Sequence, residues 1–297
     1  MKKYKEKSKD VPDGFAETYS VELYMKEKPI ILENKLLEII KKYCGNVKIV
    51  SNQDTNITFA FMDYILDYKN VSVPVTMTIS ISDEKTDNEK LRRSLEQSWN
   101  YDKDKESIES CKIKVLVTDL MAIGLEYTKR VELFQKALYA IVELMPCEGI
   151  NFHIAEQVIS REDYLENNPL NDEYDPLFGI LNVRLFNIQG QKNEYIMDTL
   201  GLSAIGLCDL QCHFKNLDPS EISNILYSYG YFIFDNQDAV DNITTVEGIS
   251  KNDKWKCRHE VALVGQERVV LDINPGKEFT SENRPCWPRF KLSTLLI

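Results

Sequence analysis

Several residue patterns that commonly build cofactor sites are missing from this sequence. The 297 residues include only 12 glycines, 3 histidines and 3 tryptophans. No G-x-G-x-x-G run occurs, and no two of the 7 cysteines have the C-x-x-C spacing. These absences argue against a dinucleotide-binding loop and against a paired-cysteine redox or zinc motif.

The sequence also lacks a hydrophobic run long enough to span a membrane. The lysines near residue 1 are followed by Asp10, Pro12 and Asp13, where a secretion signal would need an apolar stretch. The cysteines are odd in number and scattered along the chain, which is typical of reduced thiols. We therefore expect a cytoplasmic protein that has no membrane contact.

Positive charge is in deficit, because 36 Lys and Arg face 47 Asp and Glu, a formal net charge of -11. Such a field repels phosphate backbones, so we expect no nucleic-acid partner. The lysines in residues 1–12 have no apolar periodicity, and we expect a flexible basic arm there.

Hydrophobic periodicity predicts both strands and helices. Apolar and polar residues alternate over 19–26, 71–82 and 113–117, as in half-buried strands. Spacings of three and four over 34–44, 88–99 and 126–145 predict helices. The remaining strands are expected over 180–188, 194–198, 255–264 and 268–273, and a helix is expected to begin at Asp218. The fold class is therefore α+β, with two lobes that each contain a mixed or mainly antiparallel sheet with helices packed on it.

The lobe boundary is expected in the ENNPLNDEYDP stretch, which has two prolines and almost no apolar periodicity. This places an N-terminal lobe over residues 13–166 and a C-terminal lobe over residues 177–297.

Thiol and imidazole side chains, which zinc prefers, occur in the CDLQCH and CRHE segments. If CRHE lies in a strand, Cys257 and His259 share one face, and Cys212 could join them. These three residues are the candidate metal ligands. We favour the alternative that they are core thiols and a buried histidine, and we predict no cofactor, because their spacing matches no standard zinc site.

A polar group in the same region could act in catalysis. If the chain between them folds back as a hairpin, Asp198 and Asp209 lie near His213, and an aspartate beside a histidine can orient the imidazole as a general base. The favoured alternative is that Asp198, Thr199 and Asp209 bond to the backbone of the glycine-containing loop.

The segments MDTLGL, DLQCHF, KWKCRHE and RVVLDINPG resemble a bacterial family known only as a domain of unknown function. A looser likeness covers SWNYDKDKESIESCKIKVLVTDL. The resemblance implies no reaction. It singles out, without roles, the matching positions Asp198, Gly201, Gly206, Asp209, Cys212, His213, Cys257 and Glu260. With Glu260 added, the catalytic candidates are Asp198, Asp209, His213 and Glu260.

Three functions remain open at this point. The first is a non-catalytic binding protein, with an immunity-like protein that neutralises a basic protein partner as one form of it, because the chain is acidic and no nucleophile with its base and orienting group is evident. The second is a metal-dependent hydrolase that uses the His, Cys and Asp residues of the C-terminal lobe. A ligand pocket formed by the loop over residues 199–208 is a third, and the oligomeric state is left open.

Overall fold

The computed structural model describes residues 18–68, 70–83, 88–99, 101, 105–236, 243–280 and 292–294. The chain forms two compact units, one of residues 17–180 and one that contains residues 181–297. The predicted basic arm, residues 1–12, lies outside the described residues, and the predicted domain limits stay a prediction. Within the described part of the chain, no helix has the length and apolar character needed to cross a membrane.

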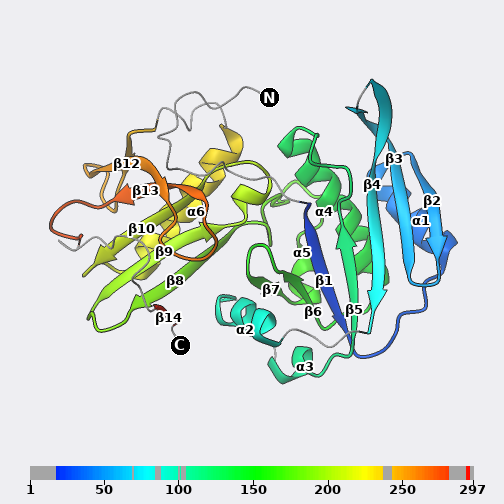
Figure 1. Cartoon of the computed structure of the whole chain (residues 1–297), viewed down its shortest axis with the longest axis horizontal. Coiled ribbons are helices and arrows are strands. Elements are labelled where there is room, and N and C mark those ends of the chain that lie inside the picture. The colour runs from blue at the N-terminus through cyan, green and yellow to red at the C-terminus, as the bar shows by residue number, and fades with distance from the viewer. Residues whose placement is uncertain are drawn as a thin grey trace. The chain divides into compact units, whose positions relative to one another are not determined.

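A seven-stranded sheet with the order β2-β3-β4-β5-β1-β6-β7 forms the first unit (Figure 1). All its described pairings are antiparallel. The strands are β1 (Ser20–Met25), β2 (Val47–Gln53), β3 (Asn56–Tyr68), β4 (Val71–Ser82), β5 (Ile113–Thr118), β6 (Gly149–Phe152) and β7 (Gln157–Ile159). Its helices are α1 (Glu33–Cys44), α2 (Asn88–Glu96), α3 (Lys105–Glu109), α4 (Tyr127–Leu144) and α5 (Arg161–Glu166).

Helices α1 and α4 pack against each other along one face of this sheet (Figure 1). The alternation of β1 directs Val21 and Leu23 towards the core, and both are fully buried. Helix α1 ends at Gly45, which has a φ of 79° and donates its backbone N–H to the carbonyl of Lys41. Glycine adopts this left-handed conformation at little cost, so it ends the helix where the sequence predicts.

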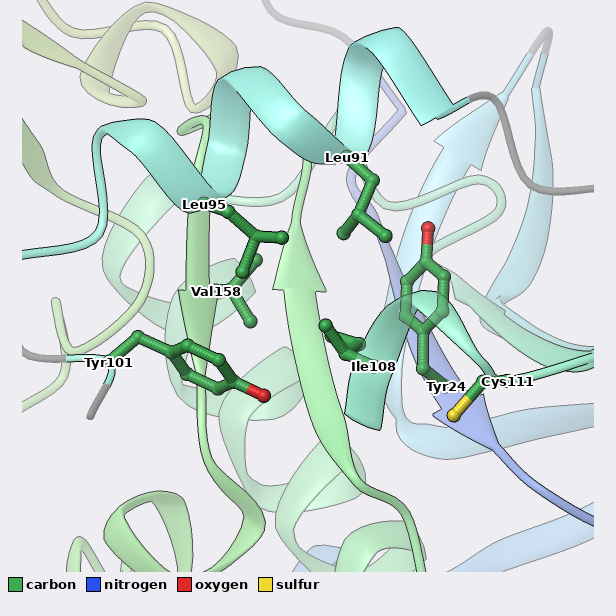
Figure 2. Close-up of a cluster of buried hydrophobic side chains, with 7 residues drawn as sticks. All are labelled: Tyr24, Leu91, Leu95, Tyr101, Ile108, Cys111 and Val158. Atoms are coloured by element: carbon green, nitrogen blue, oxygen red, sulfur yellow. The ribbon is translucent and has the colours of Figure 1, made fainter. Parts of the chain in front are cut away.

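The opposite face is covered near β1, β6 and β7 by helices α2 and α3. Figure 2 shows Leu91 and Leu95 of α2 pointing into a cluster that also contains Tyr24 of β1 and Ile108 of α3. Tyr24 is therefore buried, whereas simple alternation along β1 predicts one buried and one polar face. A strand covered on both faces loses its alternating pattern, because both sets of side chains are removed from water.

The second unit also contains a seven-stranded sheet, with the order β11-β12-β13-β10-β9-β8-β14. Its β10–β13 pairing is parallel and its other pairings are antiparallel. The elements are β8 (Asn182–Ile188), β9 (Glu194–Leu200), a 3-10 turn η1 (Leu202–Ala204), β10 (Asp209–Lys215), α6 (Pro219–Asp235), β11 (Thr245–Glu247), β12 (Lys254–Val261), β13 (Val269–Asn274) and β14 (Leu292–Thr294). Together the two sheets confirm the predicted α+β class with two sheet lobes.

Helix α6 packs on β8, β9 and β10. It begins where the sequence predicts, because the Asp218 side chain accepts from the backbone N–H of Ser220 and Pro219 follows at the first turn. Gly230 in the middle of the helix allows a close approach, since an added Cβ would lie 2.7 Å from Cδ2 of Leu181. The helix thus rests directly on Leu181, the residue that precedes β8.

The segment predicted as the lobe boundary is tied to the first unit. The side chain of Asn167 exchanges two 2.8 Å hydrogen bonds with the backbone of Asp175. Gln135 of α4 donates from Nε2 to the carbonyls of Pro176 and Phe178, at 3.0 and 2.8 Å. Polar side chains therefore hold this proline-containing stretch against the rest of the first unit.

Gly149 is predicted to be intolerant of even one added methyl group. Its Cβ would lie 2.7 Å from Cδ1 of Ile108, which is fully buried. We expect Gly149→Ala to lower the free energy of unfolding by about 1–3 kcal/mol through overpacking, and Ile108→Val to lower it by about 0.5–1.5 kcal/mol. In the double variant the Cδ1 methyl is gone, so the loss should be smaller than the sum. Urea unfolding of the four proteins measures this coupling, and additive losses would contradict it.

His153 should make the first unit less stable in weak acid. Burial lowers the pKa of His153 below 6.5, and its Nε2 lies 3.3 Å from the Ser20 hydroxyl. Because the folded state favours the neutral ring, its contribution is present above the unfolded pKa and is lost as pH falls below 6.5 towards the folded value. At about 25 °C, the free energy of unfolding of His153→Gln should therefore fall less than that of the wild type when the pH is lowered from 7 to 5. Equal losses in urea unfolding at the two pH values would rule this out.

Candidate functional site

The loop between β9 and β10 is organised by Asp209. Its carboxylate accepts from the Thr199 hydroxyl at 3.0 Å and from the backbone N–H groups of Leu202 and Ser203 at 3.1 and 3.3 Å. The Thr199 hydroxyl oxygen in turn accepts from the N–H of Leu210 at 2.8 Å. Asp209 thus bonds to the loop backbone, as the favoured sequence interpretation expects, whereas the backbone partner of Thr199 is Leu210 in β10.

Asp198 has a different role from the one that interpretation gives it. Its Oδ1 and Oδ2 accept from Nε and Nη2 of Arg184, at 2.9 and 2.6 Å, in a two-point contact. Arg268 adds a bond from its Nη2 to Oδ2 of Asp198 at 2.8 Å and one from its Nε to Oδ2 of Asp209 at 3.2 Å. We call these four residues the arginine–aspartate network. None of them is more than 2% exposed, and their formal charges cancel.

The loop that joins β12 to β13 covers this network. Arg268 donates from Nη1 to the carbonyls of Val264 and Gln266, at 3.1 and 3.2 Å, within the same loop. The backbone N–H of Leu263 donates to Oε1 of Gln211 at 2.9 Å, and Nε2 of Gln211 donates to Asp272 at 3.1 Å. Polar groups from the sheet therefore satisfy the loop backbone, as buried polar groups require.

His213, the third catalytic candidate, is 1% exposed. Its Nε2 lies 2.7 Å from Oε1 of Glu194 across the β9–β10 pair, whereas no residue in the described part of the chain forms a hydrogen bond with its Nδ1. Although His213 shares a strand with Asp209, its contact is with a glutamate that sequence reasoning did not select. Glu260, the fourth candidate, contacts Arg258 two residues away on β12.

The metal candidates occupy the other face of the sheet. Cys212 and Cys257 both pair with Ile273 of β13, so the three lie in one row, and His259 follows Cys257 on the same side of β12. Cys212 and Cys257 are buried thiols, and burial raises the pKa of Cys257 to about 12. Within the described ranges, no three His, Cys, Asp or Glu residues gather closely enough to hold a metal ion.

The two candidate sets are therefore separated by the sheet. Adjacent residues on a strand point to opposite faces, so His213 points away from Cys212, and Glu260 points away from His259. The four catalytic candidates lie on the network side and the three metal candidates on the other. The structure thus brings together no combined His, Cys and Asp site from these seven residues.

His259 is exposed, not buried as the sequence interpretation expects. Its Nδ1 lies 3.8 Å from Sγ of Cys208, a half-buried residue just before β10. The Cys208 sulfur also lies 3.3 Å from the carbonyl oxygen of Asp209 and 3.9 Å from that of Val269. A thiol and an imidazole are thus neighbours at a partly open position.

Sequence reasoning missed Arg184, Arg268 and Glu194, the partners of the candidate carboxylates and of His213. The sequence did contain a signal for Arg184, because this charged residue interrupts the apolar face of the strand predicted over residues 180–188. A turn follows that strand and leads into the strand predicted over residues 194–198, which ends at Asp198. Pairing those strands about that turn would set Arg184 opposite Asp198, as the structure does. No comparable local signal marks Arg268, since it comes 70 residues after Asp198.

Comparison with known proteins adds one finding. Residues 198–274 match a family described as Domain of unknown function (DUF4261). This range runs from the network aspartate through β10, α6 and β12 to the end of β13. The match supports the resemblance to a family of unknown function. The looser likeness over residues 98–120 lies outside the matched range. No curated protein and no solved structure matches the chain.

The arginine–aspartate network should be essential for the stability of the second unit. Arg268→Met leaves the buried carboxylates with half their cationic partners, and we expect a loss of about 3–5 kcal/mol in the free energy of unfolding. Arg258→Met is the matched control, because its ion pair with Glu260 is 60% exposed on the arginine side. We expect it to cost less than about 1 kcal/mol. Urea unfolding measures both, and equal losses would contradict a structural role for the network.

Proposed function

We propose that this chain is a non-catalytic binding protein that recognises a basic protein partner through an acidic surface on its first unit. An immunity-like role, in which the chain neutralises that partner, is the form of this function that the overall charge supports. The observation that carries the proposal is an ordered, exposed acidic segment, residues 161–175.

The acidic segment contains six carboxylates and one arginine. Five of the carboxylates are on exposed residues, namely Glu162, Asp163, Glu166, Asp172 and Glu173. The arginine, Arg161, is directed to the end of α4, where its guanidinium donates to the carbonyls of Val142, Glu143 and Met145 at 3.2 Å. The positive charge of Arg161 thus interacts with the negative end of the α4 dipole.

The backbone of the acidic segment is fixed before any partner arrives. The Ser160 side chain caps α5, and Tyr164 donates to Oε1 of Gln135 at 2.7 Å. The Asn167–Asp175 bonds close the loop around Leu170, which is 56% exposed. A rigid acidic surface with a central apolar side chain can bind without a large ordering cost, and its charge favours encounter with a cationic surface.

The alternative, a metal-dependent hydrolase, has less support. The carboxylates that would act on water or substrate are bonded to arginines and backbone amides on one face of the second sheet. The buried thiols that would hold zinc lie on the other face. A hydrolytic site needs both sets to reach one substrate.

Charge reversal within the acidic segment should abolish binding. We expect immobilised wild-type protein to capture a basic protein from a native lysate at about 50 mM salt and to release it as salt rises to about 500 mM. The triple variant Glu166→Lys, Asp172→Lys, Glu173→Lys should fail to capture it, because the cationic partner is then repelled.

The matched control carries the same change in charge on another exposed part of the first unit, in the triple variant Glu27→Lys, Glu33→Lys, Glu38→Lys. It should retain most of the binding. Loss of binding in both triple variants would show that only net charge matters, and capture of no protein by the wild type at low or moderate salt would count against the proposed function itself.

A further inference from the structure

The environment of Cys208, next to His259, differs from that of every other cysteine that the structure describes. Cys208 is half-buried, whereas Cys44, Cys111, Cys147, Cys212 and Cys257 are buried. Burial raises the pKa of Cys44 to about 12 and that of Cys111 to about 11. A thiol must lose its proton to act as a nucleophile, so these buried cysteines are held in an inert form.

We propose that Cys208 is a nucleophilic thiol that takes small, soft electrophiles, with His259 as the base that accepts its proton. The separation of 3.8 Å between Sγ of Cys208 and Nδ1 of His259 is within the looser range seen for a nucleophile and its base in the absence of substrate. His259 is exposed, so an electrophile can approach from solvent on that side. This inference is independent of the proposed binding function, which uses the other unit.

The pair is held by neighbouring strands. His259 pairs with Leu271 on β13, and Cys208 directly precedes Asp209, which pairs with Val270 on the other side of β13. The two side chains therefore approach each other across the end of a central strand. The carbonyl oxygens of Asp209 and Val269 also face the sulfur, and either can accept the single S–H hydrogen of the thiol, so a base is needed to free the thiolate.

With iodoacetamide as the electrophile, the Cys208 sulfur forms a bond to the methylene carbon as the carbon–iodine bond breaks. Iodide leaves with the bonding electron pair, and the thiol proton ends on Nδ1 of His259. The product is a thioether, so the step involves no oxidation. A small alkyl halide or another soft electrophile of similar size is thus the class of reagent that this site takes.

Alkylation of the intact, folded protein with iodoacetamide at pH 7 tests the proposal. Mass spectrometry of the digested protein gives a separate rate for each cysteine, and Cys208→Ser confirms the assignment of its peptide. An ordinary thiol is only a few per cent ionised at this pH. We expect Cys208 to react at least about threefold faster than the thiol of glutathione, and His259→Gln to remove this advantage.

The alkylation rates of the neighbouring thiols distinguish a histidine that acts as a base from one that only stabilises the structure. If His259→Gln only loosened the end of β12, Cys257 and Cys212 would be alkylated faster and Cys208 would not slow. We expect their rates to stay unchanged, and Arg258→Gln, a change next to His259 in the chain, to leave the Cys208 rate within about twofold of wild type. The proposal is overturned if Cys208 reacts no faster than glutathione, or if its rate is the same with and without His259.

Discussion

Arg184 and Arg268 can be buried only if Asp198 and Asp209 are buried with them. Removal of an unpaired charged group from water costs several kcal/mol, so each guanidinium needs a carboxylate and further acceptors. Arg184 and Asp198 face each other in one hairpin and can pair locally. Arg268 comes from a later loop and donates to the backbone carbonyl of Thr199 as well as to carbonyls of its own loop. Its burial therefore couples the end of β9, the β12–β13 loop and the sheet into one cooperative structure.

The same coupling limits what the buried carboxylates can do. Both oxygens of Asp198 and of Asp209 already accept hydrogen bonds from fixed donors. A general base must be able to reach the proton that it abstracts, and these carboxylates would have to give up structural bonds to do so. These two catalytic candidates are thus used in folding, while the accessible thiol and imidazole, Cys208 and His259, lie on the opposite face of the sheet.

Much of this fold could be predicted from local sequence, because local patterns report burial. The alternation over residues 71–82 corresponds to β4, and Asp218 with Pro219 marks the start of α6. Strands β2 and β3 were not predicted. Exposed positions on β2 and the shift in register within β3 weaken the alternating pattern there. Alternation along β1 places Tyr24 on the same face as Ser20 and Glu22, and nothing near it in sequence reveals that α2 and α3 cover that face.

The candidate site was less predictable than the fold, for a related reason. Alternation along a strand assigns Cys212 and His213 to opposite faces correctly, and it needs no partner to do so. The chemistry of His213 depends on Glu194, and that of Asp209 depends on Arg268, 59 residues later. Ionisable residues take their function from neighbours that the fold supplies, so residue type and spacing alone overstate their availability for catalysis.

In both units, arginine side chains are paired with buried aspartates or with backbone carbonyls. Arg130 of α4 pairs with Asp119 at 2.6 Å, each about 3% exposed, and burial raises the pKa of that carboxyl in spite of the arginine. Arg184 and Arg268 are buried with the network aspartates, and Arg161 is bonded to the end of α4. These four guanidinium groups, the cations best suited to two-point contact with carboxylates, are thus used internally or against backbone, whereas Arg258 pairs with Glu260 at an exposed position. The exposed carboxylates of the acidic segment are the charges that the proposed binding function uses, and binding of that kind would weaken as salt screens those charges.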